Sequence, residues 1–431
     1  MPSADIGAST ARVGARAAVP DSTVADPDAH KLLPGSSGYR RMSLALFAAG
    51  LAAFALLYST QALLPSISAD LHASADVASW TVSGATLGLA LAVLPLSALS
   101  ERFGRRRMMT VSLVVAVALA AVMPFAPSLG WLIALRVAQG AAVAGIPASA
   151  MAFLSEEVRS TALAGAVGLF IAGNSIGGMS GRILTGWVTE AGGWRAGMAA
   201  AAVSAALCAV AFRLLVPQSR HFSPAPLHPR TLAKAVRGHL ANPLLVRLFV
   251  LGLLFMTVFG AVYTVIGYRL VSDEFGLSQG MAGSIFVIYL VGTFSSAAAG
   301  KLVGRLGRRS MLYVAIGTAA AGLLLTLADS LAAVAGGLVL ITAGFFAGHS
   351  VASGAVSRTA TTGRAQAAAL YQMSYYLGSS IGGAVGALAY RAASWEATAA
   401  FALTALVAAA GVTQYATRRA VLDRRALATA R

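Results

Sequence analysis

A short basic stretch occurs twice in the chain, as Ser97-Ala98-Leu99-Ser100-Glu101-Arg102-Phe103-Gly104-Arg105-Arg106-Arg107 and as Gly300-Lys301-Leu302-Val303-Gly304-Arg305-Leu306-Gly307-Arg308-Arg309. Each copy lies between two long apolar segments, and the copies are about half a chain length apart. A hydrophobic chain that repeats a charged loop at its half-length is typical of a membrane protein built by duplication. The repeat therefore predicts two related halves.

The composition places the chain in a lipid bilayer. It is 58% hydrophobic and 11% charged, whereas a soluble domain carries roughly 25% charged residues. Many apolar runs are longer than the roughly 18 residues that mark a membrane-spanning helix. The net charge of +17 is spread over loops, so we expect no nucleic-acid partner. The single Cys208 excludes a disulfide within the chain and a cysteine metal cluster.

The apolar runs predict an all-α membrane protein with twelve transmembrane helices in two six-helix halves. The expected spans are 42–64, 78–99, 108–127, 131–153, 161–187 and 196–215, then 245–267, 281–299, 310–328, 331–355, 366–390 and 397–416. The corresponding domains are a disordered N-terminal tail (1–40), the first half (41–216), a central loop (217–244), the second half (245–417) and a basic C-terminal tail (418–431). The central loop is interpreted either as a basic amphipathic helix on lipid headgroups or as a solvated tether.

The basic residues predict the orientation. Most Lys and Arg residues fall in the two tails and the even-numbered loops, and such loops stay in the cytoplasm. We therefore expect a multi-pass protein of the bacterial inner membrane with both termini in the cytoplasm.

A second repeat lies in the fifth and eleventh spans. The run from Gly173 to Gly181 (GNSIGGMSG) has a counterpart from Gly378 to Gly386 (GSSIGGAVG), which indicates a parallel repeat. The small residues are Gly173, Gly177, Gly178 and Gly181 in the first half and Gly378, Gly382, Gly383 and Gly386 in the second. They permit close helix packing. They are interpreted either as static packing or, as we favour, as a smooth surface on which the two halves rock.

These motifs resemble the major facilitator superfamily. Its signature between spans two and three, Gly-x-Leu-Ala-Asp-Arg-x-Gly-Arg-Arg-Arg, is matched with Ser97 and Glu101 as departures, and Arg136-Val137-Ala138-Gln139-Gly140 matches the antiporter signature of span four. The run at 173–182 is similar to the YnfM-type branch of bacterial efflux carriers, with weaker likeness to the AraJ-type sugar exporters. Gly178 and Arg182 depart from the antiporter signature of span five.

The basic loops are interpreted as topology signals and as a conformational latch. Three adjacent arginines resist membrane crossing. By resemblance, Glu101 would face the positive N-terminal end of span eleven in the state closed to the cytoplasm. The second copy has Gly304 at the acid position, so the latch would be asymmetric. We expect Arg105–Arg107 to pair with Glu156 or Glu157. The latch candidates are Glu101, Arg102, Gly104, Arg105, Arg106, Arg107, Glu156, Arg305, Gly307, Arg308 and Arg309.

Polar and aromatic residues inside the spans are candidates for a substrate cavity. Arg136, with Gln139 on the same helix face, is expected to face a water-filled cavity, with snorkelling to the interface as the alternative. Arg182 is either an interfacial anchor or a second intramembrane charge. The cavity candidates are Tyr58, Gln61, Arg136, Gln139, Asn174, Phe259, Tyr263, His349, Gln372 and Tyr375.

No Asp or Glu falls in the middle of a predicted span. Proton-coupled carriers commonly use a buried carboxylate, so coupling to a proton gradient stays open, and no cofactor is expected. The solute is a neutral polar molecule, an anion paired with Arg136, or a lipophilic drug. We predict a functional monomer that exports a small organic solute by alternating access, as an efflux carrier or antiporter. The alternatives are a facilitator or exchanger for a neutral or anionic solute, or a transport-inactive sensor or scaffold. We expect no enzyme, since no nucleophile–base pair or phosphate loop is visible.

Overall fold

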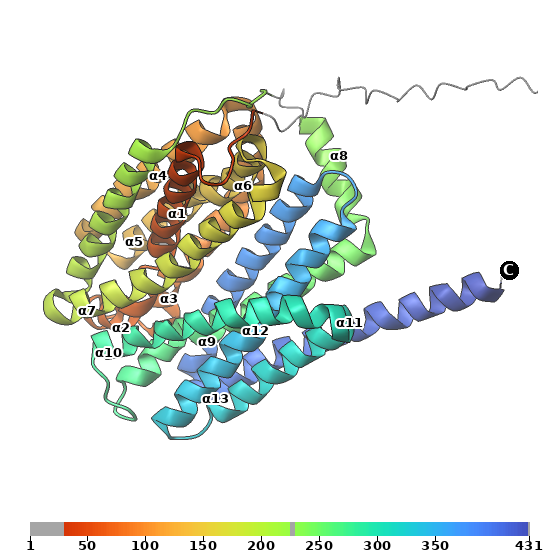
Figure 1. Cartoon of the computed structure of the whole chain (residues 1–431). Helices are drawn as coiled ribbons and strands as arrows, with labels where there is room; N and C mark the ends of the chain where they lie inside the picture. The colour runs from red at the N-terminus through yellow and green to blue at the C-terminus, as the bar shows by residue number, and fades with distance from the viewer. Residues whose placement is uncertain (1–29, 225–228, 430–431) are drawn as a thin grey trace, which may run out of the picture.

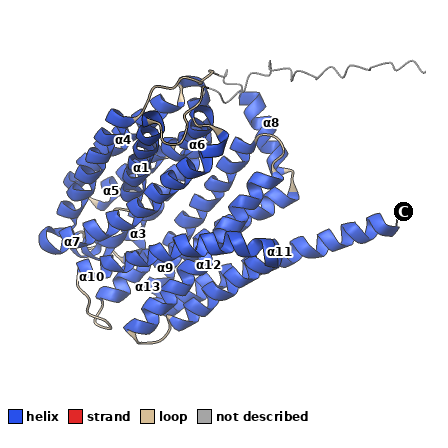
Figure 2. Ribbon diagram, in the orientation of Figure 1, coloured by secondary structure: helices blue, strands red, loops and turns tan. Residues whose placement is uncertain are grey.

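The computed structural model describes residues 30–224 and 229–429. Helices, and no strands, are drawn as secondary-structure elements in these ranges (Figure 2). They are α1 (Ser37–Leu57), α2 (Leu64–Asp70), α3 (Ala75–Phe103), α4 (Arg105–Val122), α5 (Leu129–Val143), α6 (Gly145–Glu157), α7 (Ser160–Leu215), α8 (Pro229–Leu240), α9 (Pro243–Val271), α10 (Gln279–Ser284), α11 (Tyr289–Leu325), α12 (Leu331–Thr359) and α13 (Arg364–Thr429). Short 3₁₀ turns lie at Gln61–Leu63 (η1), Met123–Phe125 (η2) and Ile285–Ile288 (η3). Most of the expected N-terminal tail lies outside the described residues.

Nine helical segments in the described ranges are long and apolar enough to cross a membrane. Three of them are much longer than the roughly 20 residues that one crossing needs, and each contains a break in helical geometry, at Gly193 in α7, at Gly307 in α11 and at Ala393–Ser394 in α13. The breaks fall in or beside the connections that the sequence predicts. The count of twelve spans stays a prediction.

The two copies of the basic loop share one backbone turn. Gly104, between α3 and α4, has φ 97° and ψ 137°, and Gly307, inside α11, has φ 77° and ψ 156°. Positive φ is strained for residues with a Cβ, which explains why glycine occupies both positions. The duplication visible in the sequence is therefore also a duplication of local geometry.

The helices form two halves that meet along two seams. Within the halves, α1 packs on α7 and α9 packs on α13; between them, α3 packs on α13 and α7 packs on α10. Figure 1 shows α1–α7 above and to the left of α9–α13 in its view. We call the end of the bundle that carries the α3–α4 turn and the α12–α13 connection the basic-loop end, and the other the opposite end.

Parts of the expected N-terminal tail and of the central loop are ordered. Leu32 N donates to Glu157 O at 2.8 Å, and Arg159 N donates to Leu32 O at 3.1 Å. Ser36 caps α1, which begins at Ser37, so the expectation of a disordered tail through residue 40 is wrong for the residues near this boundary. The central segment contains the helix α8, as one of its two interpretations required.

Candidate functional site

A buried arginine lies where the two halves meet. Arg182, on α7, is 2% exposed. Its Nε donates to Gln61 Oε1 at 2.6 Å, and its Nη1 donates to the carbonyl of Gly178. Gln61 lies in η1, beyond the end of α1, and its amide reaches Thr264 Oγ1 of α9 in the second half at 3.4 Å. The Arg182 guanidinium therefore lies in a polar connection that crosses the seam.

Aromatic rings from both halves surround this guanidinium. Its Cζ lies 4.2 Å from the ring centre of Tyr58 in the first half, and 4.8 and 4.9 Å from those of Phe286 and Tyr289 in the second. A cation over a ring face is attracted by the ring quadrupole, and more strongly where water is excluded.

The aromatic surroundings continue through the second half. Tyr289 lies 4.9 Å from Tyr263 and 5.2 Å from Phe259 between ring centres. Phe259 stacks on Phe345 at 4.0 Å. Among the predicted cavity residues, Tyr58, Gln61, Phe259 and Tyr263 are thus brought together around or beside Arg182.

His349 and Tyr375 form the far part of the same cluster. Their ring centres are 4.7 Å apart, and His349 stacks on Phe345 at 5.9 Å. The Tyr371 hydroxyl lies 2.9 Å from His349 Nδ1. Gln372 is half-buried on α13, the helix that also carries Tyr371 and Tyr375. Asn174 lies elsewhere: a Cβ at Gly50 would be 2.3 Å from its Oδ1, so it packs against α1.

Arg136 does not line a cavity in this conformation, contrary to the sequence prediction. It is fully buried inside the first half. Its Nε donates to Thr81 O at 2.7 Å. Its Nη1 donates to Leu56 O at 2.7 Å and to Gln139 Oε1 at 2.5 Å. Its Nη2 donates to Leu57 O. These carbonyls include the ones left without helical partners where α1 ends. Arg136 and Gln139 therefore join α5 to α1 and α3.

Hydrogen bonds and an ion pair join the two halves at the opposite end. Glu190 Oε2 of α7 accepts from Ser278 Oγ at 2.7 Å and from Gly280 N at 2.8 Å at the start of α10. Arg391 Nη1 of α13 donates to Asp76 Oδ2 of α3 at 3.1 Å. The seam at this end is closed by contacts between carboxylates and donors from the other half.

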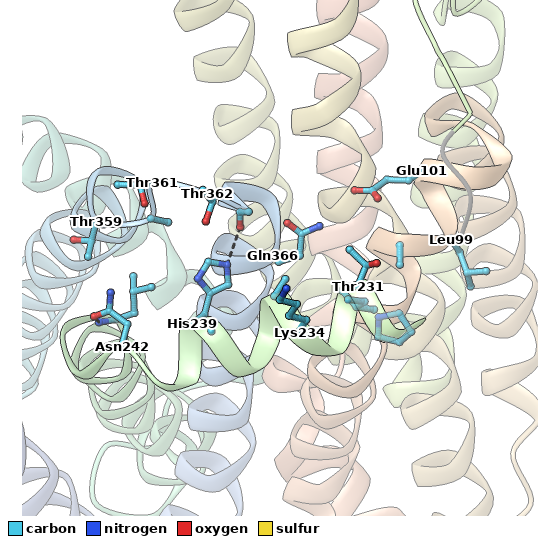
Figure 3. A pocket seen from close by; sticks show the side chains of 18 residues that line it. Leu99, Glu101, Thr231, Lys234, His239, Asn242, Thr359, Thr361, Thr362 and Gln366 are labelled. Atoms are coloured by element: carbon cyan, nitrogen blue, oxygen red, sulfur yellow. Dashed lines mark hydrogen bonds between the residues drawn. The ribbon is translucent and has the colours of Figure 1, made fainter. Parts of the chain in front are cut away.

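A cavity of about 1010 Å³ lies at the basic-loop end, between the end of α3, the helix α8 and the α12–α13 connection (Figure 3). Glu101 and Lys234 line it from different sides. Glu101 forms no hydrogen bond or ion pair within the described ranges, although it shares the cavity with Gly363, next to the first turn of α13. His239 of α8 lies 3.0 Å from the carbonyl of Gly363. The latch candidate therefore faces the predicted helix end across open space.

Arg105, Glu156 and Arg309, three of the remaining latch candidates, make their contacts within one half. Arg105 Nε donates to Glu156 Oε1 at 3.1 Å, the pairing that the sequence predicted. Glu157, also considered there, is buried and accepts instead from Arg220 N at 2.7 Å and His221 N at 3.0 Å. In the second copy, Arg309 Nη2 donates to Gln414 Oε1 at 2.7 Å.

Six of the eight repeated glycines pack inside one half, so for these six the expectation of a sliding boundary is wrong and the static-packing alternative holds. A Cβ at Gly177 would lie 2.3 Å from Leu51 O of α1, and one at Gly382 would lie 2.2 Å from Thr257 O of α9. The stripe members against the partner helix of the same half are Gly173, Gly177, Gly181, Gly378, Gly382 and Gly386.

Gly383 of the repeated run and two glycines outside that run lie at the seams between the halves. A Cβ at Gly383 would lie 2.6 Å from Ser83 Oγ of α3, and a Cβ at Gly186 of α7 would lie 3.2 Å from the Cα of Gly283 of α10. Gly186 and Gly283 stand outside the repeated run, so the repeat does not predict their close approach. In the described part of the chain, no three His, Cys, Asp or Glu side chains are grouped to hold a metal ion.

Comparisons with known proteins agree with this architecture. The family model of the Major Facilitator Superfamily matches residues 42–271 and 248–426. The chain is 38% identical over 361 residues to the uncharacterized MFS-type transporter YybF of Bacillus subtilis (strain 168), covering 84% of this chain and 89% of the relative. It is 37% identical over 375 residues to the inner membrane transport protein YnfM of Escherichia coli (strain K12), covering 87% and 90%.

Two solved structures share the fold at low sequence identity. A bacterial homolog of the human lysosomal transporter Spinster, in an inward-facing and unoccupied conformation, has a TM-score of 0.70 at 17% identity and covers 89% of this chain and 98% of its own. The nucleoside transporter NupG has a TM-score of 0.69 at 14% identity, with coverages of 86% and 99%.

Proposed function

The chain belongs to the Major Facilitator Superfamily of membrane transporters, and from this premise we propose that it exports a small organic solute across the bacterial inner membrane by alternating access. The substrate, the direction of transport and the coupling are parts of the proposal. It acts as a carrier and performs no chemical step on the solute.

The difference between the two ends of the bundle carries this proposal. At the opposite end the halves are joined by the Glu190 and Asp76 contacts. At the basic-loop end a cavity of about 1010 Å³ separates α3 from the start of α13. A carrier with two packed halves exposes its site to one side at a time by rocking these halves, and a molecule closed at one end and hollowed at the other fits one state of that cycle.

The orientation follows from charge. Arg105, Arg106 and Arg107 lie at the basic-loop end, and loops rich in Lys and Arg stay in the cytoplasm. We therefore propose that the cavity opens to the cytoplasm and the opposite end faces outward. A solute loaded from the cytoplasm would then leave when the opposite end opens.

Proton coupling would have to use a group other than a carboxylate at mid-membrane. Within residues 30–224 and 230–415, the acidic side chains all lie near the two ends of the bundle: Asp70, Asp76, Glu190, Asp273, Glu274, Asp329 and Glu396 at the opposite end, and Glu101, Glu156 and Glu157 at the basic-loop end. An exchanger or facilitator is the consistent alternative within transport.

Solute flux in proteoliposomes tests the proposal. The purified full chain is reconstituted, and uptake or release of neutral, anionic and cationic solutes is followed with and without an imposed pH gradient. We expect flux above that of protein-free liposomes for at least one class. Flux of no solute, with the protein folded, would favour the sensor or scaffold; flux insensitive to the gradient would leave a facilitator or exchanger.

A further inference from the structure

We propose that Arg182 binds the anionic group of the transported solute and that the surrounding aromatic rings hold a planar apolar body, so that the site takes an aromatic carboxylate. The inference rests on the proposed function and deepens it by naming the substrate class.

Three buried arginines differ in how their charge is satisfied. Arg269, at the opposite end, donates to Glu274 through Nε at 3.0 Å and Nη2 at 2.5 Å. Arg136 donates from all three of its nitrogens to protein oxygens. Arg182 donates from Nε and Nη1 only. Within the described residues its Nη2 has no acceptor and its charge has no carboxylate partner.

An unpaired charge inside a membrane protein is costly and marks a functional site by default. The guanidinium presents its N–H groups in a planar fork that fits the two oxygens of a carboxylate. A carboxylate at the free edge of Arg182 would supply both the missing acceptor and the missing negative charge. A neutral solute would supply only the first.

A second group points to the same ligand. Tyr289 is 9% exposed, and its hydroxyl is buried without a hydrogen-bond partner within the described ranges. The Tyr289 ring centre is 4.9 Å from the guanidinium carbon of Arg182. A tyrosine hydroxyl can donate to an anion. Arg182 and Tyr289 together thus offer unused donors from both halves of the molecule.

The rings define the rest of the ligand. Tyr58 and Phe286 flank the guanidinium, and the cluster continues through Tyr263 and Phe259 to Phe345. Aromatic pairs favour offset-stacked or edge-to-face contacts, so a planar apolar body would replace ring–ring contacts with similar ones. Among the described residues around Arg182, none is an acid that would recognise a cationic drug.

The position of Arg182 explains how the solute would gain access. Tyr58 and Gln61 come from the first half, and Phe286 and Tyr289 come from the second. A movement that separates the halves takes rings of the second half away from the guanidinium without altering the packing inside either half. The aromatic rings thus cover the charge when the site is empty.

Equilibrium binding to the full chain in lipid nanodiscs tests this inference. The probes are naphthoate, its neutral amide and naphthylmethylammonium, followed by their fluorescence. We expect the wild-type protein to bind naphthoate at least about tenfold more tightly than the amide, as for a hydrogen bond to a charged group, and the cation most weakly. Arg182→Gln should reduce the anion preference to less than about twofold, and Arg182→Lys should keep part of it.

Two further variants separate binding from folding. Arg195→Gln removes an arginine that is 45% exposed at the opposite end, and it should leave the preference unchanged. Tyr289→Phe breaks no hydrogen bond of the free protein, so its melting temperature should stay that of the wild type. Its affinity for naphthoate should still fall about threefold or more.

Equal wild-type affinity for naphthoate and the amide, or an unchanged preference in both Arg182→Gln and Tyr289→Phe, would overturn the inference and make Arg182 a structural cation. Absence of binding by any probe would overturn the aromatic class. Transport of a neutral solute unaffected by Arg182→Gln would refute the inference alone. Anion preference without flux of any solute would instead refute the proposed function.

Discussion

The two ends of the seam between the halves are built on different principles. At the opposite end, Glu190 accepts two hydrogen bonds from the start of α10, and Asp76 pairs with Arg391. At the basic-loop end, Glu101 faces the start of α13 across a cavity of about 1010 Å³. Charge-assisted hydrogen bonds are about twice as strong as neutral ones. Both ends have a carboxylate beside the start of a helix. The carboxylate of Glu190 accepts hydrogen bonds from that helix start, whereas the carboxylate of Glu101 is separated from it by the cavity.

This contrast teaches that the seams and the halves have separate tasks. The glycine stripes fix α1 on α7 and α9 on α13 at backbone contact, so each half is a stiff unit. Between the halves, a few polar contacts hold the opposite end closed. Changes at these contacts should therefore alter the balance of states more than the fold.

The largest effect is expected for Gly283→Leu. A Cβ at this position would lie 3.2 Å from the Cα of Gly186 across the seam, and the longer side chain would separate α7 from α10. Overpacking of this kind costs typically about 1–3 kcal/mol, so the opposite end should stay open and flux should fall at least about tenfold. The measurement combines proteoliposome flux with thiol labelling of Gly267→Cys in a Cys208→Ser background.

Gly267 is a suitable reporter because a Cβ there would lie 3.8 Å from Pro65 of the other half. Gly317→Leu is the matched control, since a Cβ at Gly317 meets nothing within 4 Å. If both leucine variants behaved alike, the close approach of Gly186 and Gly283 would have no bearing on transport.

A smaller shift is expected for Glu190→Gln. The glutamine amide has the shape of the carboxylate but not its charge, so the hydrogen bonds from Ser278 Oγ and Gly280 N are weaker. We expect this to destabilise the closed opposite end by about 1 kcal/mol or more. The closed opposite end should lose about fivefold in population, seen as faster labelling of Gly267→Cys. Glu396→Gln, an exposed acid of the same end, is the control, and equal labelling in the two variants would contradict the assigned role of Glu190.

The smallest shift is expected for Glu101→Gln. A carboxylate near a helix start contributes about 0.3–1 kcal/mol, and here it would act only in the state closed at the basic-loop end. Its removal should raise the population of the conformation described here about twofold to fivefold. The readout is thiol labelling of Leu99→Cys in the cavity, with Glu101→Asp as the charge-preserving control. Unchanged labelling would leave the basic loop as a topology signal.

The sequence predicts the fold because span location depends on local hydropathy and the repeat is visible in the chain itself. The Arg105–Glu156 contact was also predictable, since both residues border loops on the same side. The helix against which each glycine stripe packs could not be predicted. A four-residue period shows that some backbone lies close by, but it does not say whether that backbone belongs to the same half.

The candidate site was predictable only in part for a similar reason. Tyr58, Gln61 and Tyr263 were chosen as polar or aromatic residues inside spans, and they do lie near one another. Phe286 and Tyr289 lie inside the predicted span 281–299, but the sequence does not show that this span lies beside Arg182. Arg182, a charge within an apolar glycine-rich run, was the available signal. Arg136 is also a charge within an apolar span. Only the three-dimensional structure shows that Arg136 donates hydrogen bonds from all three nitrogens, whereas Arg182 donates from two.

The clamp made by Arg136 has a consequence for biosynthesis. Arg136, whose guanidinium donates to the carbonyl of Leu56, follows Leu56 by 80 residues in the chain. The helix α1 therefore leaves the ribosome and enters the membrane before the carbonyls at its end have these partners. These groups cost several kcal/mol each in hydrocarbon. We expect α1 to stay in a hydrated environment, beside the insertion machinery, until α5 has been synthesised, so that the first half is released into lipid as a unit rather than helix by helix.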